Sequence, residues 1–232
     1  MALHKDMKLF EMKKFLTEEV KEQILFEIAP ILHLAYSQGG YFGVPRQILC
    51  IVDFLGGLYN GFDPQKDTYK KKINGKEKTI KKIATTKKAI EFTTKIFGEI
   101  DENYKLNGHY LFYMYRHGVV HTYQPKELRL KNGEIISWLP YKGGRVDAQV
   151  SAGDILFQNV NHLVLLRHKV FPGKLFLPVS TQCLYNDLLS TIDIYVKKLE
   201  ADEGLQKKWI SAANEISEPE DYDPDLDSEV GI

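Results

Sequence analysis

The chain has 232 residues, of which 44% are hydrophobic, 12% aromatic and 27% charged. These proportions are ordinary for a globular protein, and they exclude a fibrous chain and an intrinsically disordered one. The sequence has no apolar run of about 18 residues, and its first residues lack the apolar centre of a secretion signal. It therefore predicts a cytoplasmic protein with no membrane partner.

The 31 basic and 31 acidic side chains cancel, but they are unevenly distributed. Residues 218–232 contain seven acidic side chains and no lysine or arginine, which leaves 31 basic against 24 acidic side chains, or +7, in residues 1–217. We predict an acidic disordered tail over 218–232, because this segment has too few apolar residues to form a core. The remaining positive charge can attract a polyanion, and the tail can compete with it.

Apolar residues at helical spacing run from residue 8 to residue 37, with a kink expected at Pro30. A second helix, over residues 46–59, is apolar enough to lie in the core, yet Asp53 stands within its apolar surface. A buried aspartate needs a partner, and an arginine from another helix is the natural one. The two cysteines, Cys50 and Cys183, have apolar neighbours and no metal-like spacing, which predicts buried free thiols in a reducing compartment.

Residues 61–79 are polar and rich in lysine, and the turn signal at Asn74-Gly75 predicts a loop or a small hairpin. A helix is expected from about residue 79 to residue 97. The dense positive charge has two interpretations, a solvated surface or a patch that steers phosphate groups. The candidate steering residues are Lys70, Lys71, Lys72, Lys81 and Lys82.

A central helix is predicted from about residue 101 to residue 121. Its sequence HYLFYMYRHGVVH is apolar and aromatic at first and then places Arg116, His117 and His121 within two helical turns. Because a helix that is apolar on nearly every side is buried, these three side chains need internal partners or a cleft. The other histidines form no constellation, and we expect surface or satisfied core positions for them: His4, His33, His109, His162 and His168.

Four interpretations of the three central residues are open. Two histidines four residues apart can bind zinc, but residue 118 is glycine and no third ligand is near, so we predict no metal and no cofactor. In a structural role, the histidines bond to the backbone and Arg116 pairs with Asp53. In a binding module, the same cationic cleft holds a nucleotide or a partner chain without cleavage.

The fourth interpretation is a metal-independent ribonuclease. RNA carries its own nucleophile, the 2′-hydroxyl, and a histidine with the usual pKa of about 6.5 can remove that proton at neutral pH. A guanidinium can hold the phosphate at two points and stabilise the developing charge. Positions 116 and 121 lie about 140° apart on an ideal helix, and a two-fold homodimer resolves this by placing two such sets across one cleft.

After Pro125 the apolar pattern changes, and residues 128–139 predict two strands joined by the turn Asn132-Gly133. Short strands are expected at residues 163–170 and 175–179, and helices at residues 181–200 and 205–213. We therefore predict one mainly helical domain over residues 1–217, with a small β insertion at about 127–180 after the central helix.

The segment RHGVVH, from Arg116 to His121, resembles the signature of the HEPN superfamily, in which an arginine is followed after four to six residues by a histidine near a helix end. The strings YRHGVVHTYQPK and VDFLGGLYNG resemble uncharacterised bacterial HEPN-like proteins, and the resemblance covers about residues 8–125. It implies a HEPN-like helical bundle that forms homodimers. It also implies a metal-independent endoribonuclease of a defence or toxin system, with an antitoxin-like partner.

By this resemblance, Arg116 grips the phosphate of RNA, His121 acts as acid or base, and Asp53 orients Arg116. Many members of the family have asparagine directly after the arginine, where this chain has His117. Other members have lost activity and bind nucleotides or proteins. A non-catalytic nucleotide-binding or protein-interaction module is therefore the alternative function.

Overall fold

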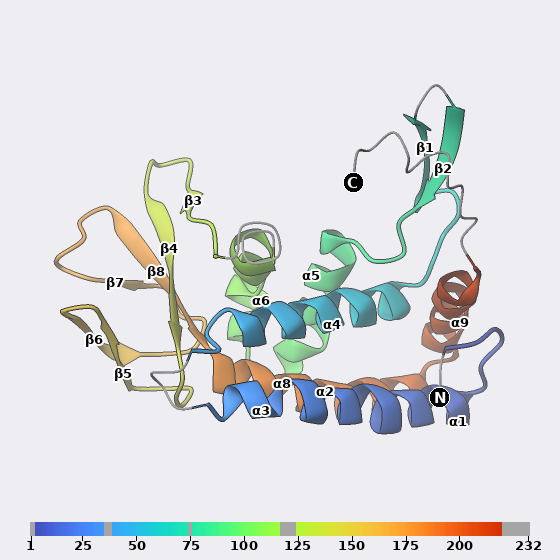
Figure 1. Cartoon of the computed structure of the whole chain (residues 1–232), viewed down its shortest axis with the longest axis horizontal. Coiled ribbons are helices and arrows are strands. Elements are labelled where there is room, and N and C mark those ends of the chain that lie inside the picture. Colours follow the sequence, from blue (N-terminus) through green and yellow to red (C-terminus); the bar gives the residue numbers. More distant parts are fainter. Residues whose placement is uncertain (1–2, 35–38, 74–75, 117–123, 220–232) are drawn as a thin grey trace.

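The structure is a computed structural model that describes residues 3–34, 39–73, 76–116 and 124–219. The chain is 51% helical and 19% strand, and its strands form three sheets. The fold is mixed α/β, so the prediction of a mainly helical HEPN-like bundle with a small insertion is wrong. In Figure 1 the four-stranded sheet stands at one end of the molecule and most of the helices lie beside it.

The first helical segments follow one another along one side of the molecule (Figure 1). Apolar residues at helical spacing bury Met12, Leu16 and Ile24 against the core. Pro30 lies in the first turn of the last short segment, where the missing N–H is tolerated. The segments are α1 (Leu9–Lys14), the π-helix η1 (Phe15–Val20), α2 (Lys21–Glu27) and α3 (Ala29–Leu32).

The predicted core helix is confirmed as α4, which buries ten of its residues. Its neighbours include three other helices of ten or more residues, and its contact with one of them, α5, is close because Gly56 has no side chain. A Cβ at Gly56 would lie 2.8 Å from the Cα of Ala89, so a larger residue would push the two helices apart. The four helices are α4 (Gly43–Asn60), α5 (Thr86–Lys95), α8 (Thr181–Ala201) and α9 (Glu203–Ser217).

The lysine-rich segment forms the antiparallel hairpin of β1 (Thr68–Ile73) and β2 (Lys76–Lys81). The hairpin projects from the helical body beyond the end of α4 (Figure 1). Because β2 continues to Lys81, the helix expected from residue 79 begins only at Thr86. Thr85 precedes it in extended conformation, and its hydroxyl accepts the N–H of Lys88 at 3.3 Å.

The central helix is divided into short pieces rather than continuous. They are the 3₁₀ turn η3 (Phe97–Glu99), α6 (Asn103–Asn107) and the π-helix η4 (Leu111–Arg116). Gly108 lies between the last two pieces, and a Cβ there would collide with the carbonyl oxygen of Tyr104. The predicted continuation to residue 121 lies outside the described residues.

The strands after Pro125 form a four-stranded sheet of order β3-β4-β8-β7 and a separate hairpin of β5 and β6. The hairpin predicted at Asn132-Gly133 is confirmed, because β3 and β4 are antiparallel neighbours. β8 lies parallel to β4 and leads directly into α8. The strands are β3 (Leu128–Arg129), β4 (Ile135–Tyr141), β5 (Ala148–Ala152), β6 (Ile155–Val160), β7 (Leu166–Arg167) and β8 (Lys174–Ser180).

The sheet is part of the core rather than an insertion, because its two faces are both covered. One face joins the main apolar cluster of the helices through Ile136, Leu177 and Val179. The other face forms a second cluster with the β5–β6 hairpin, made of Leu139, Tyr141, Val150, Phe157, Val160 and Phe176. A strand that is buried on both faces needs a second layer of structure over its outer face. Here the β5–β6 hairpin is that layer, and its sequence shows only a weak strand pattern.

Within the described residues, no helix is both long and apolar enough to cross a membrane. Both cysteines are free thiols. Cys183 is buried as predicted, whereas Cys50 is exposed, so this part of the cysteine prediction is wrong. An apolar context along the chain does not determine which side of a helix a residue occupies.

Candidate functional site

Helix α4 and the π-helix η4 pack together, and their contact brings Asp53 to Arg116. The Nε of Arg116 donates a hydrogen bond to Oδ2 of Asp53 at 2.7 Å. The side chain of Asp53 is 11% exposed and that of Arg116 is 30% exposed. The structural pairing that the sequence suggested is therefore present, with a nearly buried carboxylate and a guanidinium that reaches the surface.

This pairing uses only one edge of the Arg116 guanidinium. Among the described residues, Asp53 is its hydrogen-bond partner, and the bond comes from Nε. No residue that the structure describes accepts a hydrogen bond from the terminal nitrogens Nη1 and Nη2, which form two parallel donors. Two such donors match two oxygens of a phosphate or a carboxylate. The Asp53 contact also restricts the rotation of the guanidinium, so the donors have a defined direction.

The π-helix η4 ends at Arg116. Its hydrogen bonds run from residue i to i+5, and single turns of this kind are frequent at functional sites. The other two residues of the predicted site, His117 and His121, lie in residues 117–123, outside the described part of the chain. The convergence of Arg116 and His121 thus stays a prediction.

Cys50 lies near Asp53 on α4, and it is not suited to act as a nucleophile. Cys50 is exposed overall, but partial burial of its thiol raises the pKa of that group, the negative charge of Asp53 raises it further, and Arg116 opposes this by a smaller amount. Because the thiolate is the reactive form of cysteine, a raised pKa makes the thiol of Cys50 less reactive than an ordinary cysteine.

The candidate phosphate-steering lysines belong to the β1–β2 hairpin, which lies beyond the C-terminal end of α4 (Figure 1). Asp53, in contrast, is near the middle of that helix by its position in the sequence. Lys70 forms an ion pair with Glu77 at 3.1 Å, and Lys81 pairs with Glu215. The ammonium of Lys82 lies 4.4 Å from the ring centroid of Tyr69. The remaining two candidates, Lys71 and Lys72, are exposed on β1.

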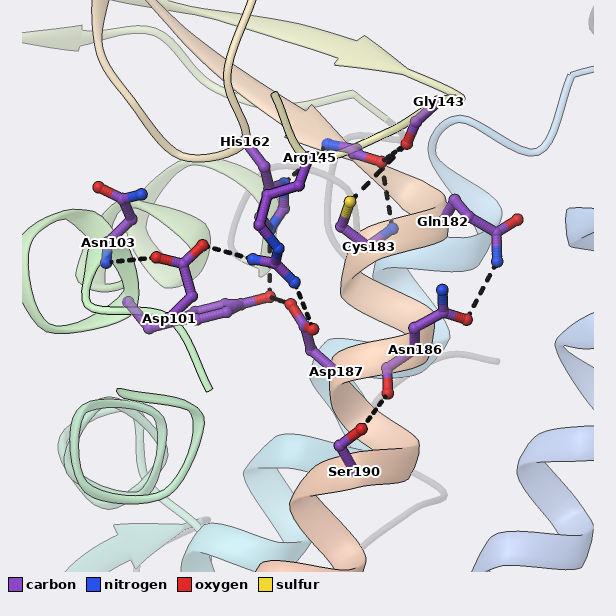
Figure 2. Close-up of polar contacts among 12 residues, drawn as sticks. Asp101, Asn103, Gly143, Arg145, His162, Gln182, Cys183, Asn186, Asp187 and Ser190 are labelled. Atoms are coloured by element: carbon purple, nitrogen blue, oxygen red, sulfur yellow. Dashed lines mark hydrogen bonds and ion pairs between the residues drawn. The ribbon is translucent and has the colours of Figure 1, made fainter. Parts of the chain in front are cut away.

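A second polar cluster lies where the sheet meets the helices, and sequence reasoning missed it (Figure 2). Arg145, between β4 and β5, donates from Nη1 to Asp101 and from Nη2 to Oδ1 of Asp187 at 2.5 Å. Asp101 precedes α6 and Asp187 belongs to α8. The side chains of Asp101 and Asp187 are 11% and 4% exposed, so Arg145 neutralises two largely buried carboxylates.

The same cluster fixes the tautomer of His162. Its Nδ1 accepts the backbone N–H of Ser180 at 3.0 Å, so the proton must be on Nε2, which lies 3.1 Å from the hydroxyl oxygen of Tyr104. Tyr104 in turn donates to Oδ2 of Asp187 at 2.6 Å. Burial and then the charge of Arg145 lower the pKa of His162 to about 3, so the ring is neutral at physiological pH.

This cluster has a structural role, because its charged groups are paired and its histidine does not titrate near neutral pH. His162 therefore has the satisfied core position expected for an isolated histidine. The sequence signal that could have revealed the cluster is Asp187, a charged residue among the apolar positions Leu184, Leu188 and Ile192 of one helix. The same signal correctly pointed to a partner for Asp53.

Within the described residues, no group of three or more histidine, cysteine or carboxylate side chains is placed to hold a metal ion. No family model, curated protein or solved structure matches this chain. The chemistry of the site must therefore be argued from its own residues.

Proposed function

We propose that this protein is a metal-independent endoribonuclease in which Arg116 binds the scissile phosphate and His121 transfers protons. The observation that carries the proposal is the Asp53–Arg116 pair. It holds a partly exposed guanidinium by Nε, and no residue in the described part of the chain accepts from Nη1 or Nη2, the donors that a ligand would use. A guanidinium with a purely structural role would be expected to use these donors internally, as Arg145 does.

The proposed reaction begins when His121 removes the proton of a ribose 2′-hydroxyl. The 2′-oxygen then attacks the adjacent phosphorus, and the bond from phosphorus to the 5′-oxygen breaks. The products are a 2′,3′-cyclic phosphate and a 5′-hydroxyl, whose oxygen takes up a proton. Arg116 stabilises the charge that builds on the phosphate oxygens during the attack. No redox step and no metal enter this balance.

We further propose that the active form is a homodimer, which would place two Arg116 and His121 sets around one cleft. Large apolar side chains on the N-terminal helical segments support an interface: Phe26 is 77% exposed and Phe10 is 64% exposed. We expect Phe26→Asp to convert the dimer to a monomer, as measured by light scattering during gel filtration. A wild-type protein that is monomeric at high concentration would contradict this part of the proposal.

The cleavage proposal is tested with purified protein, a labelled single-stranded RNA and excess EDTA. Cleavage should persist, and the new 3′ ends should carry cyclic phosphate. Arg116→Ala and His121→Ala should each lower the rate at least about 100-fold, the usual scale for losing a charge-stabilising group or a general base. Arg116→Lys should recover little, because lysine cannot reproduce the two-point contact.

Arg129→Ala provides a matched control, because Arg129 is an exposed arginine on β3, and it should cleave like the wild type. Cleavage that disappears on chelation would contradict the proposal, as would cleavage that survives in both alanine variants. RNA binding without any cleavage would instead favour the non-catalytic module.

A further inference from the structure

An open cavity of about 710 Å³ lies between the segment that leads into α4 and the strands β4 and β5. Sites for small molecules commonly have volumes of about 300–1,000 Å³ and apolar, aromatic walls. The aromatic residues that line this cavity are Tyr41, Phe42 and Trp138, and Pro140 adds a flat aliphatic surface. None of these residues belongs to the Asp53–Arg116 pair or to the Arg145 cluster.

Two of the rings form a corner that suits a flat ligand. The ring centroids of Phe42 and Trp138 lie 5.3 Å apart, and the ring planes meet at 82°. Trp138 and Pro140 are two residues apart on β4, so their side chains lie on the same face of the strand, where both are partly exposed. A planar ring that stacks on one aromatic side chain would therefore meet the edge or face of the other.

A positive charge stands at the rim of the cavity. The ammonium of Lys142 donates to the carbonyl oxygen of Leu34 at 2.8 Å and lies 5.5 Å from the ring centroid of Tyr41. It would lie 3.8 Å from a Cβ placed on Gly40, which is itself a lining residue. No carboxylate among the described residues pairs with Lys142, so its charge is available to an anionic ligand.

We infer that this cavity binds a nucleotide, with the base against Trp138 and Phe42 and the phosphate at Lys142. Stacking on aromatic side chains accommodates any base, and an ammonium binds phosphate as a point charge. The nucleotide is either a free mononucleotide or an unpaired residue of an RNA chain. The inference does not depend on cleavage at Arg116.

The position of the cavity relates it to the proposed cleavage site. Helix α4 begins at the cavity with Gly43 and carries Asp53 ten residues later. At a rise of about 1.5 Å per residue, the two points lie about 15 Å apart along the helix axis. A bound RNA could thus occupy both places on one rigid helix.

The two tryptophans make the inference measurable. Trp138 is partly exposed at the cavity, whereas Trp209 is fully buried in the core. Titration of the full-length His121→Ala protein with AMP should quench the emission of Trp138, and Trp138→Phe should abolish the change. Adenosine should bind more weakly than AMP, because it lacks the phosphate for Lys142.

Calorimetry with AMP measures the same binding without relying on tryptophan emission. Trp138→Ala should weaken binding about 5- to 150-fold, the range for losing one stacked base. Lys142→Ala should remove the preference for AMP over adenosine. Lys131→Ala is the matched control, because it alters an exposed lysine of the β3–β4 turn, and its affinity should equal that of the wild type.

A short single-stranded RNA distinguishes the two sources of the nucleotide. If RNA quenches Trp138 at lower concentration than AMP and displaces AMP, the natural ligand is part of an RNA chain. If only AMP binds, the ligand is a free nucleotide. No response to either probe would overturn the inference, as would unchanged AMP binding by Lys142→Ala, a surface variant that should leave the fold intact. A response to either probe would sustain it even if the protein cleaves no RNA.

Discussion

Two arginines of this chain face carboxylates in different ways. Arg145 distributes its terminal nitrogens between Asp101 and Asp187, so its donors are used within the protein. Arg116 gives only Nε to Asp53. An arginine whose terminal nitrogens are both used within the protein, such as Arg145, stabilises the fold. An arginine whose terminal nitrogens bond to none of the described residues, such as Arg116, can bind a ligand. This difference separates the structural cluster from the candidate site.

Asp53→Asn tests whether Asp53 positions Arg116. The substitution keeps the shape of the side chain but removes the negative charge opposite Nε. We expect a loss of about 1–3 kcal/mol in the free energy of unfolding, the scale for a weakened buried hydrogen bond to a charged group. Urea unfolding of Asp53→Asn, Arg116→Ala and the double variant should show a double-variant loss smaller than the sum, because both changes remove one interaction. Additive losses would contradict the coupling.

His162 should make the stability of the protein depend on pH in a defined window. Its pKa is about 3 in the folded protein and about 6.5 without the fold, so the unfolded chain binds a proton that the folded chain excludes. The contribution of the neutral ring is therefore complete above pH 6.5 and is lost as the pH falls toward 3, by about 1.4 kcal/mol per pH unit.

Urea unfolding between pH 7.5 and pH 4 measures this slope. His162→Asn cannot titrate, and it should show a shallower decline than the wild type even though it is less stable overall. His33→Asn changes an exposed histidine and serves as the control, because it should retain the wild-type slope. Equal slopes for all three proteins would show that His162 does not contribute.

At the scale of elements, the sequence predicted those helices and turns whose pattern lies entirely within their own residues. The long apolar periods of α4 and α8 and the turn at Asn132-Gly133 were sufficient, because each element carries its own pattern. β5 and β6 were not predicted, because AQVSA and ILFQNV bury only one and two residues and have no strong period. Their partner surface is supplied by distant residues of β4 and β8.

The candidate sites show the same division between local and distant information. Asp53 within an apolar helix surface correctly pointed to an arginine, because a buried charge must be compensated wherever it occurs. Asp187 pairs with Arg145, which lies in the irregular segment between β4 and β5. No local sequence pattern predicts that these two residues meet. The cavity at Trp138 also depends on how a strand meets the start of α4.

The β1–β2 hairpin has a charge pattern that favours an anionic partner. Lys71 and Lys72 are exposed neighbours on β1, and Lys82, directly after β2, is exposed as well. We predict that Lys71→Glu combined with Lys82→Glu weakens binding of single-stranded RNA. The slope of log affinity against log salt concentration should become shallower by about 0.7 for each phosphate that the protein no longer neutralises.

A matched control for this hairpin prediction is Lys131→Glu combined with Lys169→Glu, which changes the net charge equally at exposed positions of the sheet end. Fluorescence anisotropy with a labelled RNA at several salt concentrations provides the measurement. Equal weakening by both pairs would show that RNA responds only to the overall charge, and would contradict a role for the hairpin.

At the scale of the whole molecule, the sheet and the helices are held together by both apolar and polar contacts. The main core extends from the helices to Ile136 and Leu177 of the sheet. The Arg145 cluster closes the same boundary with buried charge, since its members come from the loops after β4 and β6 and from two helical segments. We therefore expect the Arg145 cluster to hold the sheet and the β5–β6 hairpin to the helices, so that weakening it favours local opening at this boundary.

Arg145→Met tests this connection, because it keeps much of the side-chain volume and removes the charge that neutralises Asp101 and Asp187. We expect a loss on the order of 3 kcal/mol in the free energy of unfolding, the scale for leaving buried carboxylates without a partner. Hydrogen exchange should show the largest loss of protection in β5, β6 and the loops around Arg145, with a smaller loss in α4 and α5. Arg167→Met removes a surface pair with Glu134 in which the arginine is 62% exposed, and it should leave the free energy of unfolding close to that of the wild type. If Arg145→Met lost protection equally in the sheet and in the helices, the cluster would stabilise the whole fold without acting at the boundary in particular.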